Sequence, residues 1–215
     1  MALVVFDLDG TISRHDTLLP YLTGFLLRHP IRWPRMLLSV PVLMRFLSRS
    51  ADRGELKASL MKSALGGCTR VELDAWTSSY VSSVLAHGVF ADALSVIAER
   101  RQARDVLALM SASPDLYVPE IARRLGFAQT ICTGVRWNGE RFDGELTTAN
   151  RKGAEKARCF EALRQRYPGV PTVAYANSAS DFDHLTLADE AWLVNPSAAL
   201  RRKAERAHIH SVTWR

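Results

Sequence analysis

The chain opens on a short apolar run and then changes to a helical pattern. Residues 2–6 are apolar and lead into Asp-Leu-Asp-Gly, which is typical of a buried parallel strand that opens into a turn. From residue 16 to about 86, apolar positions recur at helical spacing. The expected helices are 17–27, 36–47, 55–65 and 70–85. Four helices without a strand between them predict a helical cap inserted directly after the first strand.

The rest of the chain alternates between strand and helix patterns. The expected strands are 105–110, 127–132, 172–176 and 191–194, and the expected helices are 91–101, 115–125, 153–167, 181–188 and 197–207. Asn138-Gly139 and Asp143-Gly144 predict a hairpin between residues 135 and 146. This order predicts a three-layer, Rossmann-like α/β core with a parallel sheet. We expect the core to comprise residues 1–13 and 89–215, and the all-helical cap residues 14–88.

The amino-acid composition favours anionic binding partners. The chain has 28 Lys+Arg against 22 Asp+Glu, a net charge of +6 that favours phosphorylated metabolites or acidic lipid headgroups, although a solvated basic surface explains it equally well. No Lys/Arg block with interleaved aromatic residues occurs, which argues against nucleic-acid binding. The three cysteines lack the spacing of a disulfide framework or zinc site and suggest a reducing compartment, so we expect a cytoplasmic protein.

Candidate chemistry begins where the first strand ends. Asp7 is held directly after that strand and can act as a positioned nucleophile, while Asp9, two residues on, can transfer protons. Gly10 permits a close approach of phosphate, and Thr11 adds a hydroxyl and an N–H donor. Two carboxylates this close repel each other unless a cation neutralises them, which points to a hard ion such as Mg²⁺.

These residues resemble a known family. Residues 6–11 (FDLDGT) resemble the first motif of the haloacid dehalogenase superfamily, and the helical insertion after them resembles the C1 cap of its phosphoserine-phosphatase-like branch. Residues 107–114 (LALMSASP) resemble the second motif, and residues 173–181 (VAYANSASD) resemble the fourth. The likeness covers essentially the whole chain. It implies a magnesium-dependent phosphomonoester phosphatase that acts through an aspartyl-phosphate on a small phosphorylated metabolite, either phosphoserine-like or another.

The resemblance implies a role for each matching residue. Asp7 would be the nucleophile, and Asp9 would protonate the leaving alcohol and then deprotonate water. Ser111, with nearby backbone N–H groups such as that of Ala112, would hold a phosphoryl oxygen. Ser111 would otherwise be expected to cap the next helix, but Ser113-Pro114 fits that cap better and leaves Ser111 free.

The third motif requires a lysine that neutralises phosphate, and the sequence offers Lys152 and Lys156. A solvated helix surface is the default interpretation of either one. Lys156 is favoured, because Gly153 and Lys156 have the G-x-x-K spacing of this branch.

The fourth motif departs from the family pattern, because Asn177 stands where Asp is usual. The implied metal ligands are Asp7, Asp9, Asn177 and Asp181, with Asp183 as a weaker reserve. An amide oxygen binds Mg²⁺ without adding charge, so we expect an active enzyme that needs more magnesium. The alternative from another class is a degenerate protein that binds a phospho-ligand without turnover. The intact Asp7/Asp9 pair argues against it, whereas phosphotransfer to another acceptor stays open.

The substrate is less constrained. Asp16 matches a Glu that meets the substrate amine in phosphoserine phosphatases, but Asp16-Thr17 also fits a helix N-cap, which we slightly prefer. Lys57 and Lys62 are the nearest cations for a substrate carboxylate. The first half of the cap is rich in apolar and basic residues. Internal packing of the cap helices explains the apolar residues, and their helical spacing favours this interpretation. The same residues also fit a surface that contacts anionic lipid, as in a phosphatidylglycerophosphate-type lipid phosphatase with peripheral membrane contact.

Overall fold

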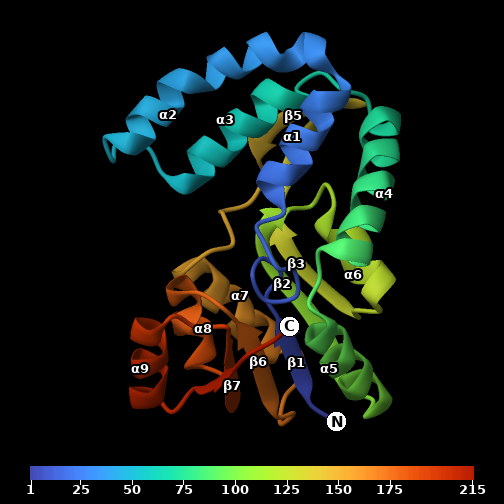
Figure 1. Ribbon diagram of the computed structural model, residues 1–215. Coiled ribbons are helices and arrows are strands. Elements are labelled where there is room, and N and C mark those ends of the chain that lie inside the picture. The colour runs from blue at the N-terminus through green and yellow to red at the C-terminus, as the bar shows by residue number, and fades with distance from the viewer.

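The computed structural model describes residues 1–215 and has a six-stranded parallel sheet at its centre (Figure 1). The strand order is β3-β2-β1-β6-β7-β8. The strands are β1 (Leu3–Phe6), β2 (Val106–Pro114), β3 (Gln129–Thr133), β6 (Thr172–Ala176), β7 (Glu190–Val194) and β8 (His210–Val212). All neighbouring pairs are parallel, which confirms the predicted α/β fold.

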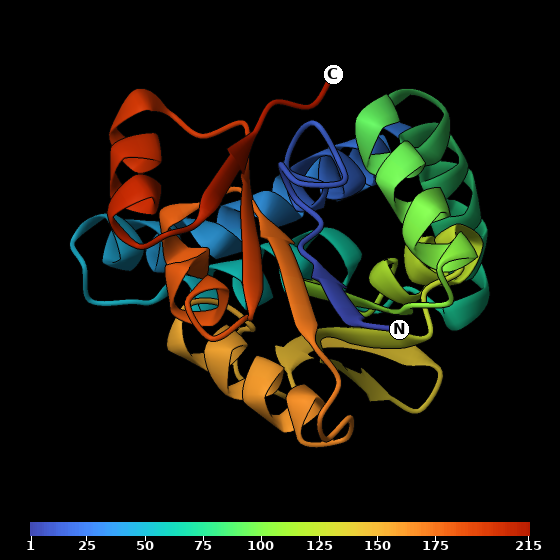
Figure 2. The ribbon, with the colours of Figure 1, turned by 90° about the horizontal axis from the view of Figure 1, so that it is seen from below.

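Helices cover both faces of this sheet (Figure 2). One face packs against α5 (Ala91–Gln102) and α6 (Val118–Leu125). The other packs against α7 (Ala154–Arg164), α8 (Phe182–Leu185) and α9 (Ala198–Arg206). Because side chains alternate along a strand, β1 sends Val4 and Phe6 to the first face and Leu3 and Val5 to the second. Burial on both faces explains why β1 is apolar throughout.

The helices between β1 and α5 form a separate layer at one end of the sheet (Figure 1). We call them the cap helices: α1 (Leu18–Arg28), the 3₁₀ helix η1 (Pro30–Ser39), α2 (Val40–Leu47), α3 (Arg53–Leu65) and α4 (Arg70–His87). Pro34 lies inside η1, where its missing N–H disfavours regular α-helical bonding. The connections into and out of this layer run side by side, and the Arg14 N–H donates to the Gly88 carbonyl (2.8 Å).

A hairpin from the second part of the chain accompanies the cap helices. Strands β4 (Val135–Asn138) and β5 (Arg141–Leu146) form a separate two-stranded sheet, and β5 packs against α3. Gly144 makes this packing possible, because it has a φ of 92° and a Cβ there would lie 2.9 Å from Lys62 Cα. This segment of the expected core therefore lies with the cap helices.

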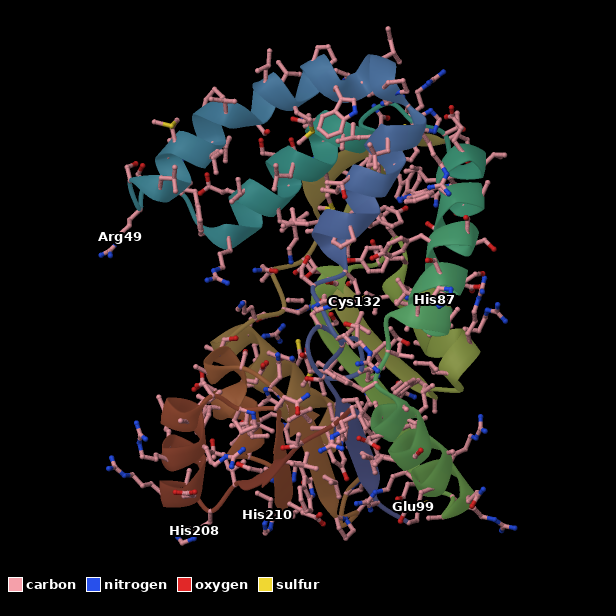
Figure 3. The ribbon with its side chains drawn as sticks, viewed as in Figure 1. Arg49, His87, Glu99, Cys132, His208 and His210 are labelled. Atoms are coloured by element: carbon pink, nitrogen blue, oxygen red, sulfur yellow. The ribbon has the colours of Figure 1, made fainter.

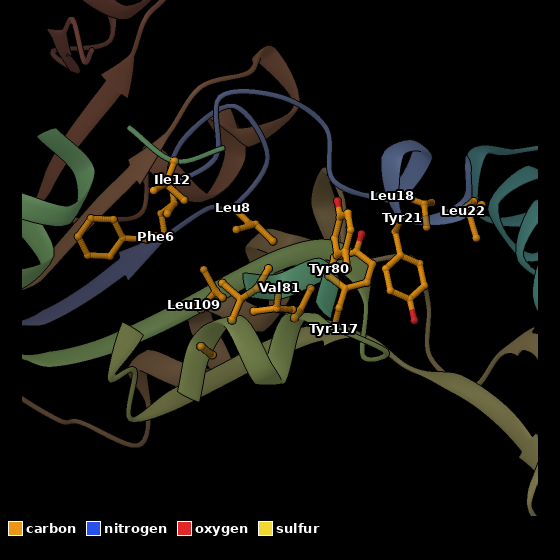
Figure 4. Close-up of a cluster of buried hydrophobic side chains, with 14 of the residues drawn as sticks. Phe6, Leu8, Ile12, Leu18, Tyr21, Leu22, Tyr80, Val81, Leu109 and Tyr117 are labelled. Carbon is orange, nitrogen blue, oxygen red and sulfur yellow. The ribbon is translucent and has the colours of Figure 1, made fainter. Parts of the chain in front are cut away.

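An aromatic cluster joins the cap helices to the core (Figure 4). Tyr21 of α1 packs on Tyr117, with ring centroids 4.8 Å apart, and on Tyr80 of α4 at 5.1 Å. Phe6 and Leu8 continue the same cluster into β1 and the turn that follows it. Burial of each large apolar side chain stabilises the fold by about 1.5–3 kcal/mol, so the base of the cap is firmly attached beside that turn.

The helix expected at residues 115–125 begins later than predicted. Strand β2 continues to Pro114, and α6 begins at Val118. The prediction that Ser113-Pro114 caps this helix is therefore wrong, because Ser113 lies inside the strand. Strand β8 was not predicted, and the helix expected at 181–188 is divided between the 3₁₀ turn η2 (Ala179–Asp181) and the four-residue α8. No helix combines the length and the hydropathy that a membrane-spanning segment requires.

Candidate active site

The carboxyl ends of three adjacent strands bring the candidate residues together. In the sheet β1 lies between β2 and β6, and Phe6 is in register with Leu109 and Tyr175. The residues that follow, including Asp7 and Asn177, therefore emerge at the same edge. This is the edge at which open parallel sheets bind ligands.

Asp7 is buried at the end of β1, with both carboxylate oxygens hydrogen-bonded. Oδ1 accepts from Lys156 Nζ (2.6 Å), and Oδ2 accepts from Thr11 Oγ1 (3.2 Å). Burial raises the pKa of Asp7 to about 7, although the charge of Lys156 opposes this rise. The ionised form of Asp7 therefore depends on positive charge close to it.

Lys156 is the lysine that contacts this carboxylate. It is 2% exposed on α7, and its Nζ donates to both Asp7 and Asp181, the latter at 2.8 Å. Burial alone would lower the pKa of Lys156, but the two carboxylates raise it above its usual value. Lys152 lines the same cavity, and burial lowers its pKa.

Asp9 is held by donors from two sides. Its Oδ1 accepts from the backbone N–H (2.8 Å) and the hydroxyl (2.6 Å) of Thr17, and its Oδ2 accepts from Ser113 Oγ (2.6 Å). Burial raises the pKa of Asp9, and these hydrogen bonds oppose the rise. Thr17 is fixed in turn, because its carbonyl accepts from the Tyr80 hydroxyl (2.6 Å) and its hydroxyl lies 3.0 Å from that of Tyr117.

Gly10 and Asn177 are in close contact beside Asp7. Gly10 has a φ of 76°, and a Cβ there would lie 2.0 Å from the side-chain nitrogen of Asn177. Glycine therefore lets the Asn177 side chain lie against the turn. Asp181 follows in the short 3₁₀ turn, where its Oδ2 accepts from Ser178 Oγ (2.6 Å).

The side-chain oxygen atoms of Asp7, Asn177 and Asp181 are suitable ligands for a hard cation. The site carries little net negative charge, because Asn177 is neutral and Lys156 pairs with both carboxylates. Asp7, Asn177 and Asp181 all line one cavity, and a carboxylate or amide oxygen is a suitable ligand for Mg²⁺. No group of three His, Cys, Asp or Glu side chains has metal-binding geometry. Both side-chain oxygens of Asp9 are already engaged, which favours a proton-carrying role for this residue over metal ligation.

The cavity has a volume of about 460 Å³, and its lining is polar with more cationic than acidic side chains. Of its 19 lining residues, only Leu18 and Ala112 are apolar. Apart from Lys156, the cationic lining residues are Arg14, Arg53, Lys57, Arg151 and Lys152. Apart from Asp7, Asp9 and Asp181, the only acidic one is Asp16. The cavity therefore attracts anions beyond a single phosphoryl group.

Comparison with known proteins identifies the family. The family model of haloacid dehalogenase-like hydrolases matches residues 4–186. The chain belongs to this family.

Two curated relatives support the assignment. Protein CicA of Caulobacter vibrioides is 30% identical over 192 residues, which cover 87% of this chain and 83% of CicA. A probable phosphatase of Mycobacterium tuberculosis is 25% identical over 202 residues, which cover 93% of this chain and 70% of the relative.

Solved structures share the fold of this haloacid dehalogenase-like hydrolase. A protein of unknown function from Bordetella pertussis has a TM-score of 0.80 at 22% identity, covering 98% of this chain and 97% of its own. A probable phosphoserine phosphatase from Vibrio cholerae has a TM-score of 0.74 at 14% identity, covering 98% of this chain and 59% of its own.

Of the two cap lysines predicted to meet the substrate of the hydrolase, one lines the cavity and the other does not. Lys57 reaches the cavity from α3, where its Nζ donates to Asn150 Oδ1 (2.7 Å) and to the Ala112 carbonyl, and burial lowers its pKa to about 8. Lys62 does not line the cavity. Its Nζ lies 3.8 Å from Asp143 and 3.5 Å from Glu145 of the hairpin, so opposite charges draw it away.

The other predicted residues differ in where they lie relative to the cavity. Asp16 lines the cavity and caps α1, because its Oδ1 accepts from the N–H groups of Leu18 and Leu19 at 3.0 Å each. Ser111 is fully buried, and its Oγ accepts from the Ser113 N–H (3.0 Å). Asp183 is exposed and lies outside the cavity.

The sequence analysis did not identify the residues that hydrogen-bond to Asp9, nor several residues that line the cavity. Ser113 had a usable signal, because residues two apart on a strand face the same side and Ser111 was already a candidate. Thr17 was considered only with Asp16 as a helix cap. Arg14, Asn150 and Arg151 gave no signal, since only the folded chain brings them to the cavity.

Proposed function

We propose that this haloacid dehalogenase-like hydrolase is a magnesium-dependent phosphomonoester phosphatase. The observation that carries the proposal is the buried Asp7 carboxylate, which Lys156 and Thr11 hold at the tip of β1 with Asp9 nearby. Phosphatase activity in the name of the mycobacterial relative supports it. The shared fold of a probable phosphoserine phosphatase is consistent with it.

In the first step, an oxygen of Asp7 attacks phosphorus and the ester P–O bond breaks. The phosphoryl group is then bound to Asp7 as an aspartyl-phosphate, and the departing oxygen takes a proton from Asp9. Burial raises the pKa of Asp9 and so favours the protonated form that this step needs. Lys156 offsets part of the negative charge that gathers around Asp7.

In the second step, Asp9 returns to its protonated form. Its carboxylate takes a proton from water as the water oxygen attacks phosphorus, and the bond between phosphorus and Asp7 breaks to release phosphate. Thr17 and Ser113 keep Asp9 in one orientation through both steps. A bound Mg²⁺ would neutralise charge on the phosphoryl oxygens, and Asp7, Asn177 and Asp181 would hold it.

The lining of the cavity supports a small, highly charged substrate. Five cations line it in addition to Lys156, whereas apolar side chains are nearly absent. A substrate with a carboxylate or second phosphate next to its phosphomonoester would pair with Lys57 or Arg53 of α3. Asp16 would meet an amine on the same molecule.

A direct test compares hydrolysis of an aryl phosphate by the parent protein and by Asp7→Asn, with and without Mg²⁺. We expect Mg²⁺-dependent release of phosphate by the parent and a loss of about 10³-fold or more in the variant, because its amide is a poor nucleophile. Asp183→Asn is the matched control, since Asp183 is an exposed acid outside the cavity. No turnover by the folded parent with aryl phosphate and a panel of anionic phosphomonoesters would favour a phospho-ligand binder.

A further inference from the structure

The outer edge of the cap helices carries an unusual concentration of exposed apolar side chains. Every residue of α2 except Arg45 is apolar, yet none of its residues is buried. The exposed large apolar residues of this edge are Leu27, Ile31, Trp33, Leu37, Leu38, Val40, Leu43, Met44 and Leu47. We call this set the apolar rim. Leu37, Leu38 and Leu47 are 71%, 68% and 67% exposed, so internal packing of the cap does not account for them.

The apolar rim is continuous along the molecule. Helices η1 and α2 follow one another at the side of the cap farthest from the sheet (Figure 1), with Arg49 at the end of α2 (Figure 3). Neither helix can cross a membrane. Exposed apolar helices that are too short to span a bilayer can instead lie parallel to its surface, with their apolar side chains in the interface.

The segment that carries the apolar rim has charges of one sign, and the nearest carboxylate that pairs with it, Glu55, comes from α3. Residues 17–51 contain no Asp or Glu but include five arginines. Arg28 and Arg49 are exposed near the two ends of the rim, and Arg45 is exposed within it. Arg45 pairs with Glu55 of α3 (3.1 Å), and Arg28 stacks on the ring of Trp76 (4.4 Å), whereas Arg49 makes no ion pair. The partner should therefore present apolar material together with negative charge.

An anionic bilayer meets both requirements better than a second copy of the chain. A symmetric dimer through this edge would bring two arginine-bearing segments together without any carboxylate from residues 17–51 to neutralise them. A bilayer with acidic headgroups accepts apolar side chains at the level of the headgroups and attracts arginine from its surface. Trp33 suits the same boundary, where its ring is partly apolar and partly polar.

We propose that the apolar rim docks the protein side-on onto an anionic phospholipid bilayer. The leucines enter the boundary between headgroups and acyl chains, and Arg49 contacts the headgroup phosphates. Docking through η1 and α2 leaves the sheet end of the molecule free. The docking does not depend on phosphatase chemistry, so a binding measurement tests it separately from the proposed activity.

The test measures co-sedimentation of the full-length protein with vesicles of phosphatidylcholine alone or mixed with phosphatidylglycerol. We expect binding to the anionic vesicles and at least about tenfold weaker binding to the neutral ones. The triple variant Leu37→Gln, Leu38→Gln, Leu47→Gln should bind anionic vesicles at least about tenfold more weakly, because it removes apolar area from the contact. Val71→Gln with Leu94→Gln is the matched control, since both are exposed apolar residues outside the rim.

A charge variant separates the two parts of the contact. Arg49→Gln should weaken binding to anionic vesicles and leave the weak binding to neutral vesicles unchanged, whereas Arg201→Gln on α9 should change neither. Hydrolysis of a soluble aryl phosphate should be the same in all these variants. The proposal is overturned if the parent binds neither vesicle, or if the triple variant binds as the parent does. A dimer of the parent that the triple variant converts to monomer would also overturn it.

Discussion

At the scale of single residues, the reactivity of Asp7 depends on how its charge is compensated. Burial raises its pKa to about 7 even though Lys156 donates at 2.6 Å. Lys156 is itself shared with Asp181, so one positive charge serves two buried carboxylates. An additional cation would stabilise the ionised form of Asp7, which is the form that attacks phosphorus in the proposed mechanism.

This arrangement predicts a pH dependence that responds to magnesium. Because the pKa of Asp7 is raised and its ionised form is reactive, kcat/KM should fall as the pH drops through about 7 when Mg²⁺ is scarce. Added Mg²⁺ should move this fall to lower pH. The measurement is the pH profile of kcat/KM for an aryl phosphate at low and saturating Mg²⁺. An acidic limb at the same pH under both conditions would contradict this interpretation.

Asn177 provides a second test at the same scale. Asn177→Asp adds a carboxylate on the cavity wall beside Asp7 and Asp181, so half-saturating Mg²⁺ should decrease several-fold. Asn150→Asp is the control, because Asn150 lines the same cavity but bonds to Lys57 of the cap. Titration of activity with Mg²⁺ measures both. An unchanged midpoint in Asn177→Asp, or an equal decrease in the control, would count against Asn177 as a ligand.

At the scale of elements, the base of the cap holds Asp9, which we propose as the proton carrier. Thr17 immediately precedes α1 and donates twice to Asp9, while Tyr80 of α4 holds the Thr17 carbonyl. The aromatic cluster of Tyr21, Tyr80 and Tyr117 fixes these helices against the core (Figure 4). The orientation of Asp9 is therefore linked to the packing of cap helices.

Tyr80→Phe tests this link. Loss of the hydrogen bond to the Thr17 carbonyl removes about 1 kcal/mol of positioning energy, so kcat should fall several-fold while KM changes little. Steady-state kinetics with an aryl phosphate measure both constants. Tyr167→Phe is the control, because Tyr167 lies in the core away from the cavity. If kcat stays at the parent value, or if KM rises while kcat is unchanged, Tyr80 does not position Asp9.

Most helices and strands could be predicted from the sequence, because an element that buries one face has apolar residues at regular intervals. Helix α1 buries Tyr21, Leu22, Phe25 and Leu26 on one face, and this spacing is visible in the sequence. Strand β8 has only three residues and none is buried, so no apolar pattern marks it. The continuation of β2 through Ser113 was hidden because Ser-Pro also suits the start of a helix.

At the scale of the whole molecule, the positive charge is placed where the cap helices meet the core. Arg53 and Lys57 come from α3, whereas Arg151 and Lys152 come from the loop before α7. The position directly after the first strand predicted Asp7 and Asp9, and the resemblance to the family's third motif predicted Lys156. The cationic wall was not predictable, because its members are distant in sequence and share no motif.

The central claim concerns a covalent bond to Asp7, and trapping that bond tests it most directly. Parent protein with substrate and Mg²⁺ would be quenched rapidly in acid, digested, and analysed by mass spectrometry. We predict a phosphoryl group on Asp7, lost on treatment with hydroxylamine as expected for an acyl phosphate and absent from Asp7→Asn. Turnover by the parent with no phosphorylated enzyme, together with hydrolysis by Asp7→Asn at the parent rate, would contradict the claim.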